Sequence, residues 1–125
     1  MDIKLIKVDV DPKTYTVSAH EMEKHITSET IAIVGSTPQY PHGTMDPIED
    51  LAILAKRYDI GLHVDCCLGS FLLPLLTEIG YKVSPFDFAV DGVSSISCDT
   101  HKFGFANKGT SVLMFKDKTL RKEAV

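Results

Sequence analysis

The sequence of 125 residues contains no apolar stretch of the roughly 18 residues that a bilayer-spanning helix needs. Residues 1–4 carry no basic region leading into an apolar run, so the N-terminus is not typical of a secretory signal peptide. Positive charge is in the minority, with 13 Lys and Arg against 17 Asp and Glu. This balance excludes nucleic acid as the main partner. Because the sequence shows neither a membrane anchor nor a signal peptide, we expect the chain alone to be cytosolic.

Cysteine is also scarce, with Cys66, Cys67 and Cys98 as the only three. Two of them are adjacent, and neighbouring cysteines pair poorly, so the sequence favours free thiols in a reducing compartment. Neither a C-x-x-C nor an H-x-x-x-H spacing is present, and we therefore predict no metal site. We expect the cysteines to be small buried residues.

Internal repeats and low-complexity segments are absent, and 44% of the residues are hydrophobic against 24% charged. This composition is typical of one globular domain with a packed core. Apolar periodicity predicts helices that begin near residues 18, 46, 71 and 116, and strands over 3–10, 30–35, 62–65, 92–98 and 111–115.

Local signals refine these elements. Ser18 and Glu21 form a capping-box pattern, and Asp46 precedes a proline as a helix N-cap would. The runs 30–35 and 62–65 are typical of strands buried on both faces. Helices alternating with such strands predict an α/β fold, a parallel sheet with helices on its faces.

Ligands bind beyond the carboxyl ends of the strands in such sheets. Three predicted strands end there in chemically useful groups, at 36–37, 63–65 and 99–102. Asp65 ends one buried strand, where a carboxylate is costly without a cation or several donors. Lys102 follows another, and a lysine near a buried site can act as a nucleophile. Together they are the minimum pair for pyridoxal phosphate chemistry, although such residues taken alone are more often a strand cap and a solvated lysine.

The flanking sequences are more specific. The stretches that carry the resemblance are STPQYPHG (36–43), HVDCCLG (63–69), SSISCDTHK (94–102) and FGFANKGT (103–110). They resemble the group II pyridoxal-phosphate-dependent decarboxylase family, and within it the branch of sphingosine-1-phosphate lyases. The resemblance covers nearly the whole chain. It implies part of a three-layer α/β/α sandwich of the aspartate-aminotransferase type (fold type I).

The resemblance also implies roles for individual residues. Lys102 matches the lysine that forms a Schiff base with pyridoxal 5'-phosphate, and Asp65 matches the partner of its ring nitrogen. His101 matches a histidine at the cofactor phosphate. Thr37, and with less support Ser36, matches a hydroxyl near the phenolic oxygen of the ring.

Two further histidines are less sharply defined. His63 lies beside the cofactor ring in the family motif. His42 either shapes the Pro-His-Gly turn or faces the substrate, and the sequence leaves both readings open.

The reaction implied by the resemblance is a retro-aldol cleavage of phosphorylated sphingoid bases to a long-chain aldehyde and phosphoethanolamine. The base is either the freed Lys102 or a histidine. Relatives of this branch act as homodimers anchored in the endoplasmic reticulum membrane, with the catalytic domain on the cytosolic face. Two alternatives stay open: an amino-acid decarboxylase of the same family, and a truncated, non-catalytic paralogue.

The match places residues 1–125 in the central part of the large cofactor-binding domain. The family's N-terminal membrane segment, much of its phosphate-binding loop and its small C-terminal domain lie outside the match. We therefore expect weak retention of the cofactor and little lyase activity from these 125 residues alone.

Overall fold

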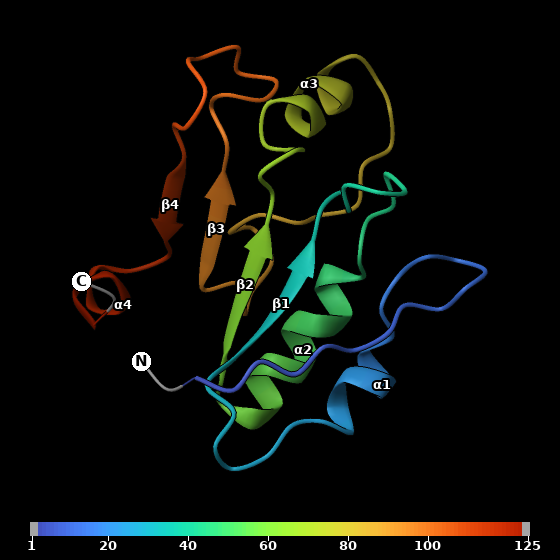
Figure 1. Cartoon of the computed structure of the whole chain (residues 1–125), viewed down its shortest axis with the longest axis vertical. Coiled ribbons are helices and arrows are strands. Elements are labelled where there is room, and N and C mark those ends of the chain that lie inside the picture. The colour runs from blue at the N-terminus through green and yellow to red at the C-terminus, as the bar shows by residue number, and fades with distance from the viewer. Residues whose placement is uncertain (1–2, 124–125) are drawn as a thin grey trace.

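The fold is built on a four-stranded sheet, and the structure, a computed structural model, describes residues 3–123 (Figure 1). The order across the sheet is β1-β2-β3-β4, with β1 to β3 parallel and β4 antiparallel to β3. The strands are β1 (Ala32–Ser36), β2 (Gly61–Asp65), β3 (Ser95–Cys98) and β4 (Val112–Phe115). The helices are α1 (Ala19–Glu23), α2 (Ile48–Tyr58), α3 (Leu72–Glu78) and α4 (Lys118–Glu123).

Helix α2 supplies the main layer against the sheet. Its apolar side chains recur at helical spacing, and Leu51, Ala52 and Ala55 are almost completely buried. They pack against Leu62 and Val64 of β2, both with 0% exposure. Each fully buried side chain of this size contributes about 1.5–3 kcal/mol, so this contact anchors the parallel strands.

The opposite face of the sheet is more open. In β1, Ile33 is buried whereas Val34 is 50% exposed, and in β2 the partly buried His63 and Asp65 alternate with the buried Leu62 and Val64. The prediction that β1 is buried on both faces is therefore wrong. The reason is that, among the described helices, only α2 contacts β1 and β2.

Strand register aligns the polar side chains of the open face. Ser36 lies opposite Asp65, and Asp65 lies opposite Ser97 on the next strand. Because β1, β2 and β3 are parallel, these residues reach the carboxyl edge of the sheet at the same level. Helix α3 lies beyond that edge (Figure 1).

Some predicted elements differ from the structure. Residues 3–10 form no strand, because none of the described strands pairs with them. The parallel sheet acquires an antiparallel strand, since β4 returns directly beside β3. Ser18 is the N-cap of α1 but makes no side-chain capping bond, so the capping box is wrong. Helix α3 has seven residues, and Pro74 lies in its first turn, where no intrahelical N–H bond is lost.

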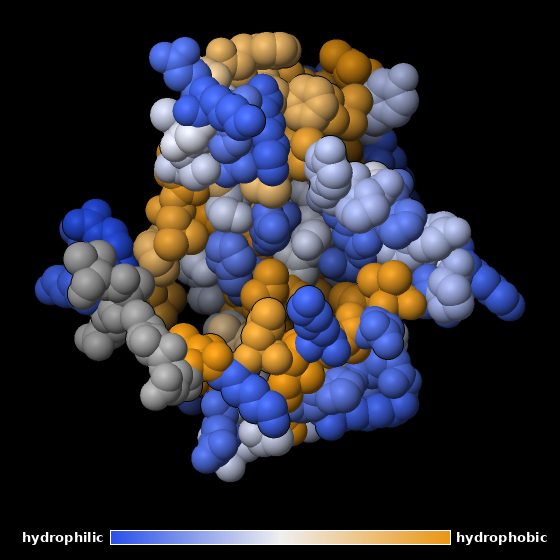
Figure 2. Space-filling view, viewed as in Figure 1, coloured by the Kyte–Doolittle hydropathy of each residue, from blue (hydrophilic) through white to orange (hydrophobic). Residues whose placement is uncertain are grey.

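No helix within residues 3–123 is long and apolar enough to cross a lipid bilayer. Apolar side chains are nevertheless exposed on this face near α3 and along β4 (Figure 2). The exposed apolar residues of these elements include Leu75 of α3, Ile79 at its C-cap and Leu113 of β4.

Asp46 has a different role from the helix cap that the sequence predicts. Pro47 is the N-cap of α2, and the Asp46 carboxylate instead accepts three N–H donors. Oδ1 accepts from Val17 N at 3.0 Å and from Gln39 Nε2 at 2.9 Å, and Oδ2 accepts from Ser36 N at 2.8 Å. Only 8% of the residue is exposed. Asp46 therefore ties the segment before α1 and the loop after β1 to the end of the sheet.

We expect Asp46→Ala to lower the free energy of unfolding by about 2–3 kcal/mol, because it leaves buried N–H donors without acceptors. Urea denaturation followed by circular dichroism measures this loss. Asp50→Ala, at an exposed position on α2, is the matched control and should change stability by about 0.5 kcal/mol or less. Equal effects of the two substitutions would contradict the structural role of Asp46.

Candidate active site

The carboxylate of Asp65 lies at the centre of the polar edge. Its Oδ1 accepts hydrogen bonds from Ser97 Oγ at 3.2 Å and from the backbone N–H of Cys67 at 3.1 Å. Burial opposes ionisation of this group, but the hydrogen bonds from Cys67 and Ser97 outweigh it and hold the pKa of Asp65 below its usual value. Asp65 is therefore an anion at neutral pH in a half-buried position.

Cys67 connects Asp65 to Lys102. Its backbone N–H donates to Asp65, and its Sγ lies 2.8 Å from Lys102 Nζ. The turn that carries Cys67 packs closely against the loop after β1, because a Cβ on Gly69 would lie 2.4 Å from the Thr37 carbonyl oxygen. This close approach requires glycine and fixes the turn against that loop.

Lys102 also contacts Asp99, with 3.0 Å between Nζ and Oδ2. The hydrogen bond to Cys67, with a further contribution from Asp99, raises the pKa of Lys102, so the amino group is protonated at neutral pH. The sequence motifs did not indicate that Asp99 and Cys67 contact Lys102. The i, i+3 spacing of Asp99 and Lys102 is the signal in the sequence that could have indicated the contact between these two residues.

His63 lies on the same face as Asp65, two residues earlier in β2. Its Nδ1 is 2.8 Å from Ser95 Oγ and its Nε2 is 3.3 Å from Ser97 Oγ. Burial lowers the pKa of His63 despite the nearby Asp65, which favours the neutral ring. His63 is thus a neutral imidazole, fixed by two hydroxyls, beside the carboxylate.

His101 is held beside Lys102 by the loop that joins β3 to β4. Its Nδ1 is 2.7 Å from the carbonyl oxygen of Thr110, which requires the proton on that nitrogen. Its Nε2 lies 3.8 Å from Asp99 Oδ2. His101 therefore belongs to the same group as Lys102 and Asp99.

Strand alternation separates the two predicted hydroxyls. Ser36 is half-buried and shares the open face with Asp65. Thr37 is fully buried, and its backbone N–H donates to the Asp65 carbonyl at 2.9 Å. Its Oγ1 is buried without a hydrogen-bond partner among residues 3–123. Ser36 is thus the hydroxyl on the side of the carboxylate.

His42 lies apart from these residues in the contacts that the structure shows. It is exposed, and its ring stacks on Tyr15 with centroids 4.1 Å apart and an interplanar angle of 8°. Tyr15 is itself tied to the loop after β1, because its carbonyl oxygen accepts from Gln39 Nε2 at 2.7 Å and Thr44 Oγ1 at 3.0 Å. The stack therefore shapes the surface of that loop.

The three cysteines divide into two environments. Cys66 is fully buried, as predicted, and burial raises the pKa of its thiol to about 11. Cys67 and Cys98 are only partly buried, so the prediction of small buried residues is wrong for these two. Cys67 departs from it because its thiol faces Lys102 at the edge of the sheet.

The donor set at this edge fits pyridoxal phosphate. A primary amine suits the aldehyde carbon, a carboxylate held as an anion suits a protonated ring nitrogen, and Ser36 offers a hydroxyl on the same face. Cys67 lies between Asp65 and Lys102, with contacts of 3.1 Å to the Asp65 carboxylate and 2.8 Å to the Lys102 amine.

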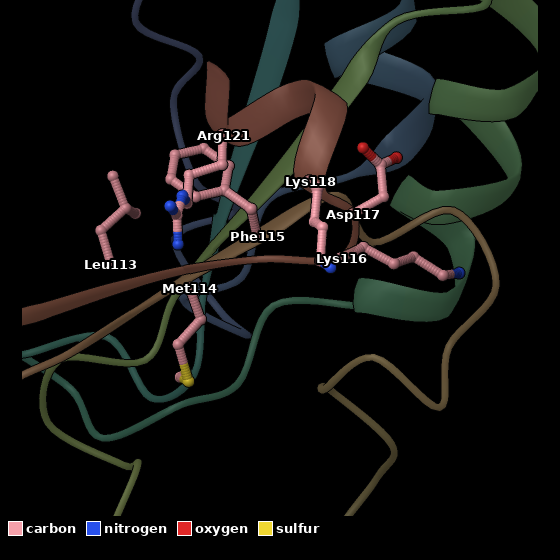
Figure 3. Close-up of a pocket in the computed structure, with 7 residues that line it drawn as sticks. All are labelled: Leu113, Met114, Phe115, Lys116, Asp117, Lys118 and Arg121. Carbon is pink, nitrogen blue, oxygen red and sulfur yellow. The ribbon is translucent and has the colours of Figure 1, made fainter. Parts of the chain in front are cut away.

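A shallow pocket of about 330 Å³ lies elsewhere, between β4 and α4. Leu113, Phe115 and Arg121 lie on one side of β4 in Figure 3, and Met114 points to the other. None of the predicted site residues lines this pocket. It follows from the way α4 folds back on β4 and has no part in the group around Asp65.

The whole chain, residues 1–125, matches the pyridoxal-dependent decarboxylase conserved domain. It is 49% identical over 122 residues to the sphingosine-1-phosphate lyase of Dictyostelium discoideum, covering 98% of this chain and 23% of that protein. It is 53% identical over 117 residues to the sphingosine-1-phosphate lyase of Drosophila melanogaster, covering 94% and 22%. The chain thus spans less than a quarter of the length of these relatives.

Solved structures agree with the sequence matches. The sphingosine-1-phosphate lyase of Burkholderia pseudomallei superposes with a TM-score of 0.88 at 45% identity, over 92% of this chain and 26% of that one. A Lactobacillus brevis glutamate decarboxylase superposes with a TM-score of 0.77 at 25% identity, over 90% and 26%. A Thermus thermophilus aspartate aminotransferase, with a TM-score of 0.60 at 23% identity over 78% and 25%, shares the fold. The expected fold class is confirmed.

His63 predicts a pH dependence of stability. Its pKa is lowered in the folded chain, so the unfolded chain binds the proton more readily as the pH falls through about 6.5. The contribution of His63 to the free energy of unfolding is fully present above that pH. It decreases below that pH, by at most about 1.4 kcal/mol per pH unit.

Urea denaturation between pH 7.5 and 5 measures this slope. His63→Gln should flatten it, whereas His25→Gln, at an exposed histidine, should leave it unchanged. An unchanged slope in His63→Gln would show that another group is responsible.

Proposed function

The chain belongs to the pyridoxal-dependent decarboxylase family, and from this premise we propose that it is a pyridoxal-phosphate-dependent carbon–carbon lyase acting on phosphorylated sphingoid bases. The cleavage yields a long-chain aldehyde and phosphoethanolamine. The observation that carries the proposal is the Asp65–Cys67–Lys102 group, in which one residue contacts both the carboxylate and the amine. Relatives named sphingosine-1-phosphate lyase, about half identical in sequence, support the choice of substrate.

Four groups would hold the cofactor. Lys102 would bind it covalently through Nζ, Asp65 would pair with its ring nitrogen, and Ser36 and His101 would contact its oxygen atoms. When bound, pyridoxal phosphate supplies a ring that accepts the electron pair released as a bond next to the amine-bearing carbon breaks. The proposed ranking of the two hydroxyls places Ser36 before Thr37, because Ser36 shares the face of Asp65.

Asp65 stabilises positive charge at the edge of the sheet. Its carboxylate is held by Ser97 and Cys67, so it neither rotates away nor takes up a proton near neutral pH. A fixed anion of this kind keeps a facing nitrogen protonated. The cost of burying its charge is offset by these hydrogen bonds.

His63 offers a neutral flat surface beside Asp65. Because burial lowers its pKa, it does not compete as a cation for the same carboxylate. The cleavage also requires a base at the substrate hydroxyl. Lys102 Nζ, once released from its covalent partner, and a neutral histidine are the two candidates.

We also propose the assembly and location that follow from the family. Residues 1–125 form the central part of a large cofactor-binding domain within a homodimer. The protein acts at the cytosolic face of the endoplasmic reticulum membrane.

Borohydride trapping with pyridoxal phosphate tests the cofactor site. We expect the label on Lys102 in peptide mass mapping, and its loss in Lys102→Ala. Asp65→Ala should reduce the trapped yield about tenfold or more, because loss of one charge-assisted contact of about 1.5–3 kcal/mol weakens binding to that degree. Lys56→Ala, at an exposed lysine, is the control. Label spread evenly over surface lysines would contradict the proposed cofactor site.

The substrate class is tested by competition. A short-chain phosphorylated sphingoid base should lower trapping on Lys102 more than glutamate does at equal concentration. The amine of a bound substrate competes with Lys102 for the aldehyde carbon of pyridoxal phosphate, so the compound that the site binds better competes more strongly. Stronger competition by glutamate would favour the amino-acid decarboxylase. No competition by either, with Lys102 still labelled, would favour a non-catalytic paralogue.

A further inference from the structure

Asp99 is a carboxylate in direct contact with the Lys102 amine. The distance from its Oδ2 to Nζ is 3.0 Å, close to that from Cys67 Sγ to the same nitrogen, 2.8 Å. The Lys102 side chain is 28% exposed and that of Asp99 15% exposed. The contact is therefore partly shielded from water, unlike the exposed lysine pairs elsewhere on the chain.

The carboxylate of Asp99 is itself fixed. Ser111 Oγ donates to its Oδ1 at 2.6 Å, and Ser111 immediately precedes β4. Cys98, which precedes Asp99, pairs with Val112, which follows Ser111. This strand pairing places Asp99 and Ser111 next to each other at the end of the sheet. The hydrogen bond from Ser111, together with that from Lys102, lowers the pKa of Asp99, so it is an anion at neutral pH.

The other titratable groups around Lys102 come from two elements. From the turn after β2, Cys67 faces the amine, and burial raises the pKa of its thiol, which is therefore neutral at pH 7. Asp65 lies behind Cys67. From the loop after β3, His101 lies 3.8 Å from Asp99 Oδ2. Among the described residues, Asp99 is thus the anion that forms an ion pair with Lys102.

We propose that Asp99 is a positioning residue for Lys102, holding its amino group at the edge of the sheet whenever Lys102 has no covalent partner. The inference rests on the proposed function only for the identity of that partner, a carbonyl compound. An ion pair places the amine but also favours its protonated form, and a protonated amine cannot attack a carbonyl carbon. Asp99 therefore lowers the reactivity of the free lysine while it keeps the amine in place.

The first test needs no cofactor. Lysines of the full chain are labelled by ¹³C reductive methylation, the Lys102 signal is assigned by its loss in Lys102→Arg, and its pH titration is followed by NMR. In Asp99→Asn the Lys102 signal should titrate at lower pH than in the wild type. Asp91→Asn removes a carboxylate that pairs with Lys56 and Lys116, and it should leave the Lys102 titration unchanged.

Ser111→Ala provides a second variant that keeps the carboxylate. It removes the hydroxyl that fixes Asp99, so the Lys102 signal should move in the same direction as in Asp99→Asn but by less. This variant keeps the test decisive if Asp99→Asn does not fold. A Lys102 titration that is unchanged in both folded variants would overturn the proposal.

The second test measures the rate of borohydride trapping of pyridoxal phosphate on Lys102 against pH. In Asp99→Asn the midpoint of the profile should move to lower pH, because the amine loses its proton more easily, and the plateau at high pH should fall, because the amine is no longer held. A purely structural defect would lower the plateau without moving the midpoint, which would contradict the positioning role. If the wild type does not trap the cofactor on Lys102, the proposed function fails, while the NMR titration still decides the role of Asp99.

Discussion

Parallel pairing of β2 with β1 and β3 is the constraint on which the candidate site depends. The register sets Ser36, Asp65 and Ser97 level at the carboxyl edge of the sheet. The pairing is held in turn by α2, whose Leu51 packs with Leu62 and Val64 of β2 in the fully buried core. Because side chains alternate along a strand, burying Leu62 and Val64 on one face necessarily turns His63 and Asp65 to the other.

Two carboxylates at this edge of the sheet are each fixed by their own hydrogen bonds. Asp65 is fixed by Ser97 and Cys67, and Asp99 is fixed by Ser111. Each anion is thus held by hydrogen bonds that do not involve Lys102. The Lys102 amine can therefore change its contacts while both carboxylates keep these hydrogen bonds. This arrangement suits the role proposed for Lys102, which alternates between a covalent partner and a free state.

Much of this arrangement could be predicted from residue order. Apolar periodicity predicted the helix that begins near residue 46, and the positions of Asp65 and Lys102 after two strands predicted that both lie at one edge of the sheet, where Cys67 contacts each of them. The contacts of Asp46 could not be predicted in this way. An aspartate before a proline at the start of a helix has the pattern of an N-cap, and the three N–H donors that Asp46 binds come from segments brought together only by folding. The same holds for Cys67, which was expected to be a buried residue.

The sequence by itself determined the α/β class, the family and the identity of the proposed catalytic pair. These follow from local periodicity and from motifs, which are properties of neighbouring residues in the chain. Only the tertiary structure decided which hydroxyl faces Asp65, that β4 runs antiparallel, and that Asp99 holds the Lys102 amine through a carboxylate fixed by Ser111. Hydrogen bonds and ion pairs depend on distances of about 3 Å between side chains, and those distances arise only when strands pair and helices pack.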